Sequence, residues 1–132
     1  MPKVINFSNA MTIGMHSLII LAREKKPMNA IQLAGRIGST KFHVAKVLQR
    51  LVKDGILSSM RGPTGGFNLM RDPSEITVFD IYRSIEGEID YDECTHTNPI
   101  TPIDKCIRET IVKKMTVDFV NYMKDHTVAD YM

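Results

Sequence analysis

The chain has 132 residues, of which 43% are hydrophobic and 24% are charged, and its formal net charge is +2. This length accommodates one domain with a sizeable core but excludes a second, catalytic domain, and the composition excludes wholesale disorder. The longest apolar stretch, Leu18 to Ala22, is far too short to span a membrane, and the first residues lack the pattern of a signal peptide, so we expect a cytoplasmic protein without a membrane partner.

Positive and negative charges are concentrated in different segments. Residues 36–61 contain six basic side chains and one acid, whereas residues 72–93 contain eight acids and one arginine. A basic segment of this kind favours contact with a polyanion. We therefore expect a polyanion-facing surface in the first half of the chain.

Helical spacing of apolar residues predicts two helices before residue 38. The first covers about residues 9–24 and ends before Pro27, which cannot continue a helix. The second is short and begins after Asn29, a favourable N-cap with Gln32 at the capping-box position. Gly38 ends it, because glycine readily adopts the left-handed conformation that closes a helix.

A third, amphipathic helix is capped by Ser39 or Thr40 and continues to about Asp54, where Gly55 stops it. Its apolar side consists of Val44, Leu48, Leu51 and Val52. Its opposite side carries four hydrogen-bond donors at increments of three, four and three residues: His43, Lys46, Arg50 and Lys53. Most charged stripes only solvate a helix, but this stripe also suits contact with a polyanion.

The second and third helices with the tight turn between them form the parts of a helix-turn-helix. In that motif the second helix enters the major groove of DNA with its N-terminal residues. We therefore predict double-stranded DNA as the partner. The candidate contact residues on this helix are Ser39, Thr40, Lys41, His43, Lys46 and Arg50.

A hairpin follows the third helix. Residues 56–60 and 67–70 are two short candidate strands, and the Gly- and Pro-rich segment Arg61-Gly-Pro-Thr-Gly-Gly reverses the chain between them. The hairpin resembles a wing, and Arg61 at its base suits contact with the adjacent DNA backbone or minor groove. The candidate DNA contacts on it are Arg61, Thr64 and Gly65.

Two further helices are predicted after the hairpin. Thr77 and Asp80 begin a short helix that ends at Gly87. A longer helix covers about residues 104–124, and its apolar stripe suits packing against a partner helix. The stripe recurs every four residues, and we predict it as the dimer interface: Ile107, Ile111, Met115, Phe119 and Met123.

The segment Arg61-Gly-Pro-Thr-Gly-Gly and the later Asp72-Pro-Ser-Glu-Ile-Thr-Val-Phe-Asp resemble the wing and following helix of the IscR and NsrR family of bacterial winged-helix regulators, also called the Rrf family. The similarity extends from about Ile5 to Tyr131. It implies a mainly α, winged helix-turn-helix fold with a two-stranded wing and a long C-terminal dimerisation helix. It also implies a homodimeric transcription regulator that binds a pseudo-palindromic operator, and we expect this regulator to be a repressor.

The resemblance divides the chain into three parts. Residues 1–87 are expected to form the DNA-binding domain, residues 88–105 a sensor loop, and residues 106–132 the dimerisation helix with a C-terminal turn.

In family members that sense iron, nitric oxide or redox state, three loop cysteines hold an iron-sulfur cluster. Here the outer pair corresponds to Cys94 and Cys106, but Ile100 occupies the middle position. The chain is more similar to relatives in which two loop cysteines and a histidine on the first helix bind a 2Fe-2S cluster, and His16 aligns with that histidine. Thr12 stands where such relatives place a glutamate, so the fourth ligand would come from Glu109, His96, Asp92 or Glu93.

Other interpretations of these residues stay open at this stage. Cys94 and Cys106 could instead form a thiol-disulfide switch or an inert pair, and His16 could be a polar residue at the edge of the dimer interface. Eleven residues separate the cysteines, unlike a Cys-x-x-Cys motif, and no catalytic constellation is evident, so we do not expect an enzyme. The alternative functions are a cysteine-dependent redox protein and an interaction module without DNA binding.

Overall fold

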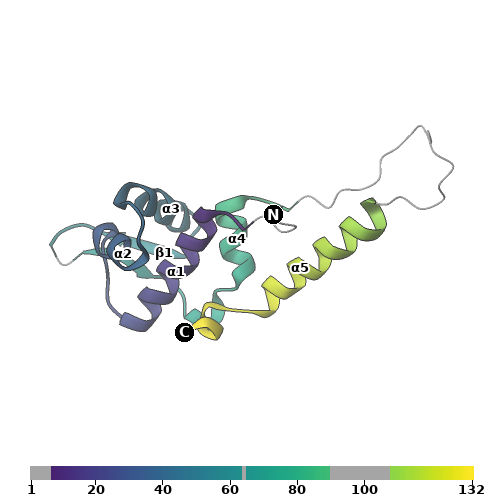
Figure 1. The fold of residues 1–132 in the computed structure, drawn as a ribbon. Coiled ribbons are helices and arrows are strands. Elements are labelled where there is room, and N and C mark those ends of the chain that lie inside the picture. The colour runs from purple at the N-terminus through teal and green to yellow at the C-terminus, as the bar shows by residue number, and fades with distance from the viewer. Residues whose placement is uncertain (1–6, 64, 90–107) are drawn as a thin grey trace.

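The structure is a computed structural model that describes residues 7–63, 65–89 and 108–132 (Figure 1). The helices and strands are α1 (Asn9–Glu24), α2 (Ala30–Ile37), α3 (Lys41–Lys53), β1 (Leu57–Met60), β2 (Gly66–Leu69), the 3-10 turn η1 (Pro73–Glu75), α4 (Val78–Glu86), the π-helical turn η2 (Arg108–Val112), α5 (Lys113–Asp125) and the 3-10 turn η3 (Val128–Tyr131). This order confirms the prediction of a mainly helical chain with a two-stranded wing. None of the helices in these ranges is long and apolar enough to cross a membrane.

Both predicted ends of α2 and the predicted start of α3 are confirmed by their caps. Asn29 and Gln32 exchange side-chain to backbone hydrogen bonds of 2.8 and 2.9 Å, and Gly38 closes α2 with a φ of 82°. The hydroxyl of Thr40 accepts a hydrogen bond from the backbone N–H of His43 at 3.2 Å. Thr40, not Ser39, is therefore the N-cap of α3.

The wing is an antiparallel hairpin in which Leu57 pairs with Leu69 and Met60 with Gly66. Both strands begin one residue away from their predicted starts. Ile56, predicted as the first residue of β1, is instead buried in the turn after α3, where its carbonyl accepts a hydrogen bond from the backbone N–H of Met70 at 3.0 Å.

The base of the wing is attached to the segment that precedes α2. The backbone N–H of Phe67 donates to the carbonyl of Met28 at 2.8 Å, and the N–H of Met28 donates to the carbonyl of Phe67 at 3.2 Å. Gly66 permits this contact, since a Cβ at this position would lie 2.5 Å from the carbonyl carbon of Met28 and its φ is +143°. Backbone hydrogen bonds thus join the wing to the helix-turn-helix, and the buried side chains of Leu57 and Phe67 add to this attachment.

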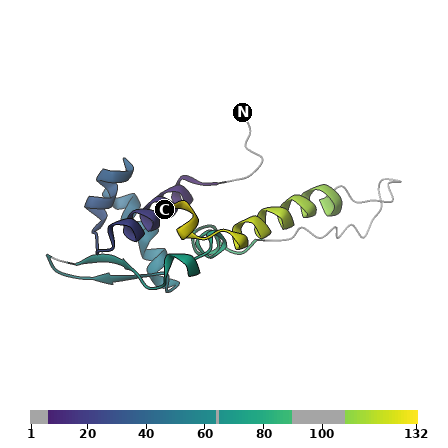
Figure 2. The ribbon, with the colours of Figure 1, turned by 90° about the horizontal axis from the view of Figure 1, so that it is seen from below.

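Helix α1 lies at the centre of the core, between α3 on one side and α4 on the other (Figure 1). Leu18, Leu48 and Ile81, one from each of these helices, are completely buried. Burying a side chain of this size stabilises the fold by about 1.5–3 kcal/mol relative to leaving it exposed. Turned by 90°, the molecule shows the wing at one end and α5 extending from the other (Figure 2).

Helix α5 packs its second half against α4. The ring of Phe119 meets the ring of Tyr82 edge-on, with 5.5 Å between centroids, and Val120 is buried behind it. Burial raises the pKa of the Tyr82 hydroxyl, and the carboxylate of Glu86 adds to that rise. The first residues of the predicted helix, Ile107 among them, lie outside the described residues, and a π-helical turn precedes α5.

Met123, which was predicted as part of the dimer interface, is 1% exposed and lies in the chain's own core. An α-helix turns by about 100° per residue, so a stripe with strict four-residue spacing advances by roughly 40° at each step. Over the distance from Ile111 to Met123 the stripe therefore winds from one side of the helix toward another. Ile111 and Met115 are 61 and 51% exposed, whereas Phe119 is half-buried and Met123 is covered by the chain itself.

We expect Gly66→Ala to destabilise the protein by about 1–3 kcal/mol, since the added methyl group meets backbone and the φ is positive. Gly35→Ala is the matched control: nothing lies within 4 Å of its Cβ position, and alanine in a helix is favoured by about 0.5–1 kcal/mol. Urea unfolding of both variants measures the difference. A Gly66→Ala protein as stable as the Gly35→Ala protein would contradict the role given to Gly66.

Candidate nucleic-acid interface

The outward side of α3 carries a stripe different from the predicted one. Phe42, Lys46, Gln49 and Lys53, at increments of four, three and four residues, are all exposed. Lys41 is exposed next to the first of them. The opposite side of α3 is buried in the core through Val44, Val47, Leu48 and Leu51. The exposed N-terminal half of α3 therefore offers two cations and one aromatic ring.

The predicted DNA-contact residues of α3 have different environments. Lys41 and Lys46 are exposed, as contacts to phosphates or bases require. Ser39 and His43 are half-buried at the start of the helix. The hydroxyl of Thr40 accepts the capping hydrogen bond, so one of its two acceptor lone pairs is occupied. Three of the five residues at this end, Thr40 and the two lysines, are thus exposed.

Arg50 lies at the other end of α3, and its guanidinium is already engaged. It donates a 2.6 Å hydrogen bond to the carbonyl of Ile85, in the last turn of α4. The hydroxyl of Ser84 donates back to the carbonyl of Arg50 at 3.3 Å. A cation is favourable at a helix C-terminus, where carbonyl groups lack helical partners. Arg50 therefore attaches α3 to α4, and one of the guanidinium donors that was predicted to contact DNA is used inside the chain.

The wing lies at the same end of the molecule as α2 and α3, as Figures 1 and 2 agree. Arg61 follows β1 and is exposed, and Gly65 is half-buried before β2. Gly65 cannot be replaced without a clash, because a Cβ there would lie 2.3 Å from the carbonyl oxygen of Met60. Thr64, the remaining predicted wing contact, lies outside the described residues.

Phe42 is the site residue that the sequence reasoning missed. It is 77% exposed, although it is a large apolar side chain on an amphipathic helix. The signal was its position, two residues before the buried Val44 and hence about 200° around the helix from it. Gln49 is also exposed on this face and was not predicted, because a pattern of charges does not identify neutral residues.

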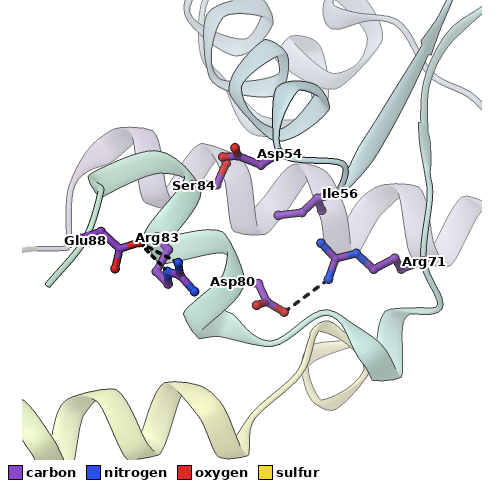
Figure 3. A pocket seen from close by; sticks show the side chains of 7 residues that line it. All are labelled: Asp54, Ile56, Arg71, Asp80, Arg83, Ser84 and Glu88. Carbon is purple, nitrogen blue, oxygen red and sulfur yellow. Dashed lines mark hydrogen bonds and ion pairs between the residues drawn. The ribbon is translucent and has the colours of Figure 1, made fainter.

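A charged cleft of about 280 Å³ lies between the end of α3, the end of β2 and α4 (Figure 3). Arg71 and Asp80 form an ion pair of 3.7 Å inside it, and Arg83 and Glu88 form one of 2.6 Å. These pairs match the cleft's arginines with carboxylates of the chain itself. We therefore assign the cleft a role in joining α4 to its surroundings, and no ligand.

The first half of α5 presents an apolar face that the chain does not cover. Ile111, Val112 and Met115 are 61, 43 and 51% exposed. Tyr122 is 54% exposed further along the helix and stacks on the ring of His126 at 3.9 Å between centroids. Exposed apolar area on one helix is typical of a contact with another chain.

Only some of the predicted cluster ligands lie among the residues that the structure describes. His16 is exposed on α1. Cys94 and Cys106 both lie outside the described residues, as do His96, Asp92 and Glu93. Among the residues that are described, no group of three His, Cys, Asp or Glu side chains could hold a metal ion. Glu109, one of the candidates for the fourth ligand, lies in η2. The described part of the chain thus contains two of the predicted ligand positions, His16 and Glu109, and the cluster stays a prediction.

Sequence comparisons connect this geometry to known proteins. The family model Rrf2, described as an iron-dependent transcriptional regulator, matches residues 7–132. A candidate HTH-type transcriptional regulator of Lactococcus lactis, YffB, is 36% identical over 76 residues, which are 56% of this chain and 49% of YffB. The chain thus spans about half the length of that relative. The HTH-type transcriptional regulator IscR of Serratia proteamaculans is 24% identical over 112 residues, which are 85% of this chain and 68% of IscR.

Two solved structures are similar over nearly the whole chain. CymR, the global cysteine regulator of B. subtilis, superposes with a TM-score of 0.82 at 21% identity. The superposition covers 97% of this chain and 96% of CymR. IscR of T. potens superposes with a TM-score of 0.77 at 24% identity and covers 97% of this chain and 86% of that one. These likenesses confirm the predicted winged-helix fold.

Proposed function

The chain belongs to the Rrf2 family of transcriptional regulators, which are not enzymes, and we propose that it is a homodimeric repressor that binds a pseudo-palindromic DNA operator through α3 and the wing. The observation that carries this proposal is the exposed N-terminal half of α3, with Lys41 and Lys46 free of the core, at the same end of the molecule as the wing. In a helix-turn-helix this half of the second helix meets the base edges.

The DNA-contact set that we propose is smaller than the one expected from the sequence. Lys41, Lys46 and Arg61 contact phosphates or guanine acceptors, and Ser39, Thr40 and His43 border the same surface. Arg50 is left out, because its guanidinium is bound to the carbonyl of Ile85. The proposed set combines a helix in the major groove with a wing on the adjacent backbone or minor groove.

The proposed dimer forms through the first half of α5. Ile111, Val112 and Met115 form the exposed apolar face there, and a second copy of the same helix provides a matching surface. The two-fold symmetry of such a dimer presents two α3 helices to two half-sites of DNA. Once one α3 helix is bound to its half-site, the second α3 helix meets the other half-site at a high effective concentration. Dimer formation therefore raises the affinity for the operator.

We further propose that Cys94 and Cys106 control DNA binding. Thiolates and an imidazole are ligands that suit iron, the family description names iron, and a cluster held by Cys94, Cys106 and His16 would supply a redox-sensitive charge. The second candidate is a disulfide between the two thiols, which needs no further ligand. Both candidates depend on the two cysteines, which lie in the sequence between α4 and α5.

Replacing Lys46 by alanine is expected to lower the salt dependence of DNA binding. Removal of one phosphate contact reduces the slope of log affinity against log salt by about one unit. Arg50→Ala is the matched control, a cation of the same helix that should leave the slope unchanged but lower the free energy of unfolding by about 1–2 kcal/mol through the lost hydrogen bond. Electrophoretic mobility shift over a salt series, on DNA from upstream of its own gene, measures the slopes.

The slopes also decide the proposal itself. An unchanged slope for Lys46→Ala would remove that lysine from the contact set. No salt-sensitive binding of the unaltered protein to any promoter DNA would contradict the proposed function.

Met115→Asp is expected to dissociate the dimer, because it places a charge in an apolar contact. We expect the dimer dissociation constant to rise by at least about a hundredfold, which corresponds to roughly 2.7 kcal/mol. Met70→Asp is the matched control, since Met70 is 59% exposed directly after β2 and does not belong to the face proposed for the dimer. Analytical ultracentrifugation measures both variants. A Met115→Asp protein that stays dimeric would exclude this face as the interface.

Anaerobically purified protein is expected to contain iron and sulfide and to absorb visible light, and both Cys94→Ser and Cys106→Ser should lose these signals. Loss of the signals in His16→Ala as well would assign His16 as a ligand. If iron is absent, thiol alkylation and mass spectrometry after mild oxidation test the disulfide. Control by the cysteines is contradicted if neither iron nor oxidation alters DNA binding.

A further inference from the structure

We propose that Phe42 reads the operator by contacting the C5-methyl group of a thymine in the major groove of each half-site. This inference rests on the proposed function, because it assigns a base preference to the same α3 surface. It adds an apolar, methyl-reading contact to a surface that otherwise recognises charge and hydrogen-bonding groups.

The exposure of Phe42 is the first observation. At 77%, it is the most exposed of the large hydrophobic side chains in the described part of the chain. It lies on the outward side of α3, about 200° around the helix from the buried Val44, so its ring cannot turn into the core. An aromatic ring that its own chain leaves uncovered is suited to an external partner.

The position of Phe42 along α3 is the second observation. It is the second residue of the helix, directly after the Thr40 cap and Lys41. The first residues of a recognition helix are those that reach the base edges of the major groove. Ile31 on α2 and Met60 on the wing are also strongly exposed, but neither has this position.

The charges around the ring identify the partner. The ammonium group of Lys41 lies 5.1 Å from the ring centroid of Phe42, and Lys46 is exposed one helical turn further on. A ring flanked by two cations suits a polyanionic partner that also carries an apolar group. A wholly apolar protein groove would leave the two cations without partners. On the base edges of the major groove, that apolar group is the thymine methyl group.

The experiment removes the methyl group alone. An operator is selected from a random-sequence DNA duplex library with the unaltered protein, and each thymine is replaced in turn, in both half-sites, by deoxyuridine. We expect one symmetric pair of positions at which the replacement weakens binding by about fourfold for each half-site contact, the value that corresponds to one buried methyl group. For Phe42→Ala, binding to the thymine operator falls by at least as much, and the same replacement has no further effect.

Two controls keep the interpretation specific. Ile31→Ala removes another exposed apolar side chain, 64% exposed on α2, and should keep the full sensitivity to deoxyuridine. Phe42→Ala should leave the melting temperature and the salt slope unchanged, because the side chain is exposed and uncharged.

The outcomes separate this inference from the proposed function. A Phe42→Ala protein with the same deoxyuridine profile as the unaltered protein, or an operator whose thymines can all be replaced without effect, would overturn the role of Phe42 while DNA binding stands. If the unaltered protein selects no operator at all, the proposed function fails, and the inference fails with it.

Discussion

Two backbone hydrogen bonds between Met28 and Phe67 hold the wing against the segment that precedes α2, and the geometry of the candidate interface depends on them. A helix in one groove and a hairpin on the neighbouring backbone can act together only if their separation is fixed. Backbone pairing fixes it more firmly than side-chain contacts do, since it leaves no rotamer freedom. Gly66 is part of the same constraint, because any side chain there would meet the backbone of Met28.

The two ends of α3 have different tasks. At the N-terminal end, Lys41, Phe42 and Lys46 are exposed, and the hydroxyl of Thr40 caps the first turn of the helix. At the C-terminal end, Arg50 and Ser84 exchange hydrogen bonds with the backbone of α4 and α3 respectively. Helix α4 in turn contacts α5 through the rings of Tyr82 and Phe119. Contiguous contacts therefore connect the surface proposed for DNA with the helix proposed for dimerisation.

Helix α5 packs against the chain's own core at one end and leaves an apolar face exposed at the other, because its apolar stripe winds around it. Four-residue spacing drifts relative to a turn of 3.6 residues, so residues that look equivalent in the sequence face different directions. Ile111 and Met115 are left exposed, while Val120 and Met123 complete the core of the chain itself. The same periodicity thus anchors the helix at one end and leaves an apolar face at the other.

The sequence by itself determined what depends on neighbours within a few residues. The bounds of α1, the capping box of Asn29 and Gln32, the closing Gly38 and the hairpin all follow from local hydrogen bonds and backbone preferences. Only the tertiary structure decided which side chains of a correctly predicted helix are available. Arg50 is engaged by a carbonyl 35 residues away, Met123 is covered by packing, and Phe42 is exposed because the core takes the opposite side of α3. The availability of each side chain depends on which segments, distant in the sequence, pack against it. The charge and spacing of residues along the chain do not specify that packing.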